Sequence, residues 1–159
     1  MRKLKIIRIV LWVLLLAVLA MIFCFSAQSG ETSNGASKGI AQVILRVIRP
    51  DFSQLSQHQQ NVLVEKTNLI LRKGLHFAEY ALLAFVTYLL LSAYSLRLRV
   101  VLSWLGATVY AVTDEVHQLY VGARMGSGWD VLIDSLGAAA GVALACALVY
   151  SKRKKVRKV

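Results

Sequence analysis

The residues best suited to chemistry lie in one stretch, residues 110–134, which reads YAVTDEVHQLYVGARMGSGWDVLID. Six ionisable side chains in this stretch stand between two long apolar runs: Asp114, Glu115, His117, Arg124, Asp130 and Asp134. Ionisable groups at the ends of hydrophobic segments are costly wherever they enter lipid, so they usually mark function. We therefore take this stretch as the centre of the candidate site.

A second polar group lies earlier in the chain, where residues 72–80 read RKGLHFAEY. Residues three and four apart share a face of a helix, so this segment carries one polar stripe. Its members are Arg72, His76, Glu79 and Tyr80. The same spacing predicts two further stripes, one of Asp114, His117 and Gln118 and one of Asp130 and Asp134. Glu115 points about 100° away from Asp114 on the same helix.

Three kinds of chemistry fit these residues. His117, held by Asp114, could act as a general base while Arg124 clamps a phosphate or a carboxylate. Two histidines and several carboxylates, as HxxE at His76 and as DExH at Asp114, could hold a divalent metal ion such as Zn²⁺. No HExxH pattern is present, and there is no Ser or Cys nucleophile signature. The third reading is recognition of a charged headgroup or peptide without turnover.

Each of these residues also has a structural reading. Arg124 could pair with Asp130, and His76 could be a hydrogen-bonding residue of the core. Glu115 and Lys73 are expected to be solvated at the membrane interface. The motif Gly137-Ala-Ala-Ala-Gly141 places small residues four apart, a pattern typical of close helix packing rather than of chemistry.

The composition predicts a membrane protein. Hydrophobic residues make up 57% of the 159 residues, the mean hydropathy is +0.59, and the apolar residues occur in blocks. A helix needs about 20 apolar residues to cross a bilayer, and four runs meet that length. The predicted spans are residues 6–25, 75–94, 100–120 and 131–150. The fold class predicted is all-α: a polytopic membrane protein with four transmembrane helices and amphipathic helices in a long first outer loop.

The net charge of +11 is distributed as in a membrane protein rather than a nucleic-acid-binding protein. If both termini are cytoplasmic, 12 of the 19 Lys and Arg residues lie on the inner side, as the positive-inside rule requires. All eight Asp and Glu residues then lie on or near the outer side. We predict a multi-pass protein of the cell membrane with cytoplasmic termini, whose basic tail, residues 151–159, suits anionic lipid.

The outer loop, residues 26–74, belongs with the spans to a single domain that covers residues 1–159. Residues 29–39 are rich in Ser, Gly and Asn and predict a loop. Residues 36–48 predict a short helix on the membrane surface, which Pro50 stops. A second amphipathic helix is expected over residues 61–71, with a bend at Gly74 before the second span. A short cytoplasmic turn, residues 95–99, joins spans two and three.

Alternating spans bring the polar stripes to one membrane level, although they come from opposite ends of their segments. This predicts a polar cavity that opens outward. Its expected lining is Gln28, His76, Glu79, Asp114, His117, Arg124, Asp130 and Asp134, with Arg72, Tyr80, Glu115 and Gln118 as further binding residues.

At these residues the chain resembles the VanZ-like family of bacterial membrane proteins. The matching pieces run in the family's order over most of the chain: Phe25-Ser26-Ala27-Gln28, Arg72-Lys73, His76-Phe77, Glu79-Tyr80, Asp114-Glu115, His117-Gln118, Arg124, Asp130-Val131, Ile133-Asp134 and Gly137. One departure is local, because the family often has Pro-Gly before the arginine, whereas Gly122-Ala123 stands here. The resemblance implies a cell-envelope protein, whose named member is linked to low-level resistance to teicoplanin, a glycopeptide antibiotic.

Three functions follow as expectations. The first is a VanZ-like membrane protein that acts at the outer face, on or near lipid-linked or peptidoglycan-related envelope components, and lowers glycopeptide susceptibility. The second is a membrane-embedded hydrolase or transferase that uses the His/Asp/Glu site, with or without a metal. The third is a non-catalytic helical bundle. The expected partners are membrane lipids, a lipid-linked cell-wall precursor or a glycopeptide, and a second copy of the chain, but no nucleic acid.

Overall fold

The computed structural model describes residues 2–28, 30–120 and 127–156. Within these ranges the chain is helical and has no strand. The elements in order are α1 (Arg2–Ser26), α2 (Gly30–Ile48), the 3-10 helix η1 (Phe52–Gln54), α3 (Gln57–Leu90), α4 (Leu96–Leu119) and α5 (Gly128–Val156). The all-α fold class is therefore confirmed for the described part of the chain.

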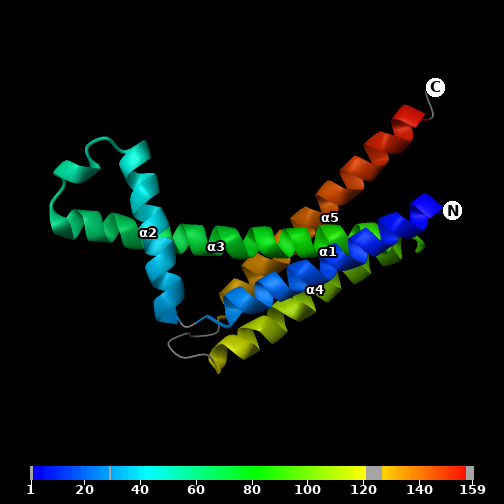
Figure 1. Ribbon diagram of the computed structural model, residues 1–159, viewed down its shortest axis with the longest axis horizontal. Coiled ribbons are helices and arrows are strands. Elements are labelled where there is room, and N and C mark those ends of the chain that lie inside the picture. The colour runs from blue at the N-terminus through cyan, green and yellow to red at the C-terminus, as the bar shows by residue number, and fades with distance from the viewer. Residues whose placement is uncertain (1, 29, 121–126, 157–159) are drawn as a thin grey trace.

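Four helices run lengthwise beside one another, and α2 crosses the N-terminal half of α3 at one end of them (Figure 1). The N-terminal end of α1 and the C-terminal end of α5 lie at the opposite end of the molecule (Figure 1). The main core lies between α1, α3, α4 and α5, and its largest fully buried side chains are Tyr80, Tyr88 and Ile22. A smaller core, which includes Leu45, Phe52 and Val64, joins α2 and η1 to the start of α3.

The closest packing is between α3 and α5. A Cβ atom on Gly137 would overlap the carbonyl oxygen of Phe77, and one on Gly141 would overlap that of Ala81. The two backbones can approach this closely only because these positions have no side chain. The small-residue motif therefore serves helix packing, as its sequence predicted.

Among the described residues, three helices are long and apolar enough to cross a membrane: α1, α4 and residues Gly128–Lys152 of α5. Their outward surfaces carry exposed apolar side chains such as Val10, Val109 and Leu136, as lipid-facing helices do. The predicted span 75–94 falls in the C-terminal half of α3, which is not among these candidates because His76 and Glu79 interrupt its apolar sequence. A multi-pass count of four stays a prediction.

One prediction for the outer loop is wrong. Residues 30–39 are helical rather than a loop, because α2 is held against α3 through Ser37, Ala41 and Leu45, which recur every four residues. Tertiary packing of this kind overrides weak helix propensity. Residues 61–71 are helical as expected, but they continue into the predicted second span as one helix, α3, from Gln57 to Leu90. A bend at Gly74 stays a prediction. A single glycine costs a helix only about 1 kcal/mol, and here it is not a break.

Other boundaries agree more closely with the sequence. The helix over residues 36–48 is part of α2, which ends two residues before Pro50. Its location on the membrane surface stays a prediction. Ser56 begins α3 with a reciprocal capping box, in which the Ser56 hydroxyl accepts from the Gln59 N–H and the Gln59 side chain accepts from the Ser56 N–H. The turn between α3 and α4 lies at residues 91–95 rather than 95–99.

Candidate functional site

The predicted site lies at the end of the bundle away from the termini. There α1 and α4 end, α5 begins, and α3 passes at its middle (Figure 1). The structure brings together side chains from α3, α4 and α5 that the sequence separates by up to 60 positions. The expected meeting of the three polar stripes at one level is therefore seen in the fold, and the individual contacts decide what it can do.

Asp134 is the most deeply placed acidic group. Its side chain is 0% exposed, and its Oδ1 lies 3.9 Å from Nδ1 of His76 on α3. Neither carboxylate oxygen has a hydrogen-bond partner among the residues that the structure describes. Four other carboxyl groups lie within electrostatic range of it, those of Glu79, Asp114, Glu115 and Asp130. A buried carboxylate among like charges is unfavourable unless a cation or a hydrogen-bond donor pairs with it. The position of Asp134 therefore favours a functional role over a purely structural one.

Asp114 and Gln118 form a buried pair on α4. Gln118 Nε2 donates to Asp114 Oδ2 at 3.0 Å, and both side chains are almost completely buried. Tyr80 of α3 is fully buried within electrostatic range of both Asp114 and Asp134. The four-residue spacing on α4 thus gave the right face, and the pair lies beside the predicted stripe of α3.

Glu115 is buried, contrary to the expectation that it is solvated at the interface. It is 6% exposed, and its Oε2 accepts a 2.8 Å hydrogen bond from the N–H of Ser127, one residue before α5 begins. The first N–H groups of a helix lack partners within the helix and carry partial positive charge, so a carboxylate is stabilised there. Glu115 therefore joins the end of α4 to the start of α5.

Lys73 is also paired rather than free at the interface. Its Nζ lies 3.2 Å from Oδ1 of Asp130, in the first turn of α5. Both side chains remain about one-third exposed, so the pair lies at the rim of the site. Asp130 thus has a partner from α3, whereas the alternative partner Arg124 lies outside the described residues.

His117 does not contact Asp114 in the described part of the site. Its ring stacks on Phe23 of α1 with centroids 5.1 Å apart, and its Nδ1 lies 3.5 Å from Oγ of Ser26. His117 therefore fastens the end of α4 to the end of α1. The predicted arrangement of a base oriented by Asp114 is not formed, and the histidine that does lie beside a buried carboxylate is His76.

A cavity of about 270 Å³ opens beside His76, between the end of α1, α2 and the middle of α3. Four residues predicted for the site line it: Gln28, Arg72, His76 and Glu79. Arg72 also donates through Nη1 to the side-chain oxygen of Asn34 on α2 at 2.8 Å, and Asn68 lies 3.5 Å from the same oxygen. The wall of the cavity formed by α2 is thus attached to α3 through Asn34.

Removing that attachment should loosen α2 without disturbing the bundle. We expect Arg72→Ala to increase amide hydrogen exchange in α2 by about 5- to 20-fold, since a hydrogen bond from a charged donor contributes about 1.5–3 kcal/mol at most. Exchange in α4 and α5 should change little. The matched control is Arg46→Ala, which removes an exposed arginine of α2. Equal effects of the two variants would contradict the role of the Arg72–Asn34 bond.

The described residues contain no group of three or more His, Cys, Asp or Glu side chains placed to hold a metal ion. The acidic side chains of the site are instead distributed among Gln118, the start of α5, Lys73 and His76. The expectation of a divalent metal therefore has no support from the described geometry.

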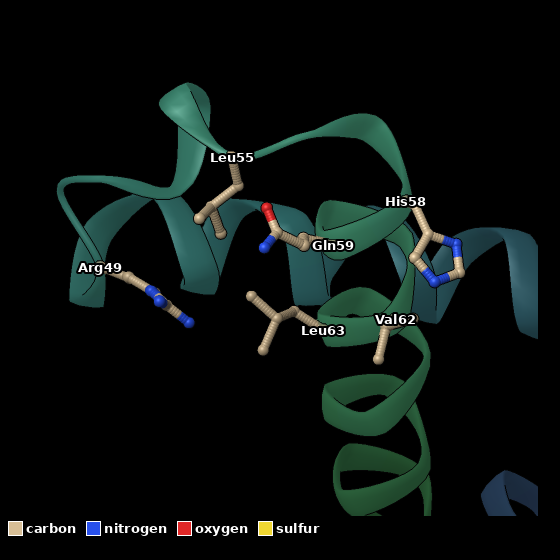
Figure 2. A pocket seen from close by; sticks show the side chains of 6 residues that line it. All are labelled: Arg49, Leu55, His58, Gln59, Val62 and Leu63. Atoms are coloured by element: carbon tan, nitrogen blue, oxygen red, sulfur yellow. The ribbon is translucent and has the colours of Figure 1, made fainter.

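A second hollow, of about 320 Å³, lies far from these residues, between the end of α2, η1 and the start of α3. Figure 2 shows Arg49 and His58 on opposite sides of it, with Leu63 between them. The Arg49 side chain donates to the Asp51 carboxylate at 3.1 Å, and this hydrogen bond lowers the pKa of Asp51. His58 is exposed, as its polar surroundings predicted.

Several contacts of the site could not be read from polar stripes. Asn34 was assigned to a loop and Ser26 to the start of the outer loop, and Ser127 contributes a backbone N–H that no side-chain pattern reveals. Arg99 was placed in a cytoplasmic turn, but it is 5% exposed in the first turn of α4. The usable signal for Ser26 was its position at the end of an apolar run, at the same level as His117.

The comparisons with known proteins agree with this picture at the level of a family. A family model described as VanZ/LLP1 matches residues 11–150, which include every residue of the site. No curated protein and no solved structure matches the chain.

Proposed function

We propose, from the premise that this chain belongs to the VanZ/LLP1 family, that it is a four-span protein of the cell membrane whose acidic site faces outward and acts on or near cell-envelope components. Through that action it lowers susceptibility to the glycopeptide teicoplanin. The acidic site is defined here as Asp114, Glu115, Asp130 and Asp134 with His76, Glu79 and Lys73.

The orientation rests on charge. Basic residues gather at the start of α1, at the start of α4 and at the end of α5, and these parts lie at one end of the bundle (Figure 1). The acidic site lies at the other end. The positive-inside rule then puts the termini in the cytoplasm and the acidic site at the outer face. The C-terminal half of α3 completes the fourth span, with its polar residues turned to the other helices instead of lipid.

The observation that carries the proposal is the burial of Asp134 beside His76. A protein that needed these helices only for packing would do better with apolar side chains of similar size, because buried charges rarely add net stability. Here one carboxylate is fully buried, four more are near it, and a cavity opens beside the adjacent histidine. This arrangement supports binding of an envelope component that presents hydrogen-bond donors, such as a lipid-linked cell-wall precursor or the glycopeptide itself.

A second candidate is catalysis by the same residues. A histidine beside a buried carboxyl group is a candidate general base, and His76 Nδ1 lies 3.9 Å from Asp134 Oδ1. This distance is longer than a hydrogen bond, so Asp134 would orient the ring only after the two groups move closer. A membrane-embedded hydrolase or transferase would then use His76 rather than His117. Its nucleophile would come from a substrate or from water.

The test is teicoplanin susceptibility of a sensitive Gram-positive host that expresses the chain. We expect the wild type to raise the minimal inhibitory concentration over the empty vector and His76→Gln to return it to the vector level. Glutamine keeps hydrogen-bonding capacity but can neither take up a proton nor carry the charge of a histidinium. Because His58 is exposed in the distant hollow of Figure 2, His58→Gln is the matched control and should behave as the wild type.

Membrane abundance of each variant separates the remaining readings. Loss of resistance in proportion to lost protein would support the non-catalytic bundle and contradict a working site. No effect of the wild type would contradict the link to teicoplanin. If resistance depends on His76, turnover of added lipid-linked precursor by wild-type membranes, absent with His76→Gln, would favour the catalytic candidate over binding alone.

A further inference from the structure

Arg99 is a buried cation at the end of the bundle opposite the acidic site. It is 5% exposed and lies in the first turn of α4. Its Nε and Nη2 atoms donate to the backbone oxygen of Tyr88 at 3.3 and 3.2 Å. Its guanidinium carbon lies 4.1 Å from the centroid of the Tyr88 ring. These contacts orient the guanidinium group and satisfy a carbonyl in the last turn of α3.

None of these partners carries a negative charge. All eight Asp and Glu residues of the chain lie between positions 31 and 79 or between 114 and 134. The nearest on the same helix, Asp114, is 15 residues away, or about 22 Å along the axis. No described carboxylate pairs with Arg99, and its Nη1 donates to no described group. A buried guanidinium without a counter-anion is unfavourable, so an anion from outside the chain would stabilise it.

A cavity is present where that anion would bind. It has a volume of about 430 Å³ and lies between the α3–α4 turn and the last turns of α5. Arg99 lines it together with hydroxyl-bearing side chains, those of Ser92, Tyr94 and Tyr150. Leu96 and Val149 add apolar surface to the same cavity. The lining thus combines one fixed cation, neutral donors and a surface suited to acyl chains.

We propose that this cavity binds the phosphate of a phospholipid from the membrane leaflet at the terminal end of the bundle. Arginine is the side chain best matched to phosphate oxygens, because its planar guanidinium offers several donors in a fixed geometry. The cavity lies near the ends of two helices that are long enough to cross a membrane, which is the depth of lipid headgroups. Tyr94 and Tyr150 are exposed there, as tyrosines at a membrane interface are.

The cavity lies at the opposite end of the bundle from the acidic site, and lipid binding there does not depend on teicoplanin. It assigns Arg99 two tasks at once, to cap the C-terminal end of α3 and to hold a lipid phosphate. A purely structural arginine would cap α3 without holding a lipid. Filling the rest of the cavity would then leave lipid binding unchanged.

The experiment uses the full-length protein in detergent micelles. After delipidation, dioleoylphosphatidylglycerol is added and bound lipid is counted by native mass spectrometry. We expect one tightly bound lipid, with about 10-fold or greater weakening in Arg99→Gln, since loss of charge-assisted hydrogen bonds of this kind changes affinity by that order. The matched control is Arg97→Gln, which removes the same charge from an exposed position two residues away and should weaken binding less than 2-fold.

Three further arms keep the test decisive. Ala147→Phe fills the cavity from α5 without touching the charge, and it should also displace the lipid. Dioleoylglycerol, which has the same tails but no phosphate, should not bind. Inorganic phosphate should compete only at far higher concentration than the lipid, because it lacks the apolar contacts.

Equal losses in Arg97→Gln and Arg99→Gln would show general attraction to a basic surface and would overturn the proposal. Retention of lipid by Ala147→Phe would overturn it as well. If inorganic phosphate competes as well as the lipid, the ligand is a free phosphate and the assignment to phospholipid is wrong. Should Arg99→Gln fail to fold, Ala147→Phe alone decides between the lipid site and a purely structural arginine.

Discussion

Gly141→Ala is expected to destabilise the folded protein, because of the glycines compared in the described part of the chain Gly141 makes the closest backbone approach. Its new Cβ would overlap the carbonyl oxygen of Ala81, a backbone atom that cannot rotate away. The two helices would have to separate along their whole contact. Overpacking of this kind costs about 1–3 kcal/mol, and here the upper part of that range applies because both sides of the contact are backbone.

The measurement is the thermal melting temperature of the purified protein in detergent. A loss of about 2–3 kcal/mol corresponds to roughly 4–12 °C for a chain of this size. Gly106→Ala is the control, because a Cβ at Gly106 meets nothing within 4 Å. It should leave the melting temperature unchanged or slightly raised, since alanine is the better helix former. Similar melting temperatures for the two variants would contradict the close approach of α3 and α5.

Asp134→Asn is expected to make the protein more stable and less active at the same time. The carboxamide has nearly the same shape as the carboxyl group, but it cannot ionise, so no negative charge can form there near the four other carboxyl groups. We expect a gain of about 1–2 kcal/mol, because a buried charge among like charges opposes folding. Resistance to teicoplanin should fall to the vector level, since the amide gives His76 neither a charged partner nor a proton acceptor.

The comparison variant is Asp51→Asn, which alters an exposed carboxylate whose described partner is Arg49. Its free energy of unfolding should stay within about 0.5 kcal/mol of the wild type, and resistance should be unaffected. A stabilised Asp134→Asn that keeps full resistance would remove the acidic site from the function. An unfolded Asp134→Asn would instead assign Asp134 to the structure of the bundle. A residue kept for function at a cost in stability should not unfold the protein when it is replaced.

Helix periodicity was sufficient to predict the faces of α3, α4 and α5 that meet at the acidic site. It placed His76, Asp114 and Asp134 at one level, because alternating directions and a 3.6-residue repeat leave little choice once the apolar runs are found. The glycines of α5 also carried a readable packing signal. These features depend on spacing within single helices, which a sequence displays directly.

Partners across helices were harder to predict. Glu115 was predicted to be solvated at the membrane interface, but it is buried and accepts a hydrogen bond from the backbone N–H of Ser127. A pattern of side chains does not reveal such a backbone donor. His117 was assigned to Asp114 by spacing, whereas the end of α1 supplies Phe23 and Ser26 instead. Residues 30–39 have the composition of a loop, and only packing on α3 makes them helical. These contacts depend on the side chains and backbone groups of a neighbouring helix. The sequence of one segment alone does not contain that information.

The length of α3 has a mechanical consequence. Its 34 residues span about 51 Å, whereas the apolar interior of a bilayer is about 30 Å thick. The helix α3 therefore packs against α2 near its N-terminal end, carries His76 near its middle, and places Tyr88 next to Arg99 at its C-terminal end. A tilt of α3 about its close contact with Gly137 and Gly141 of α5 would therefore move its two ends in opposite directions.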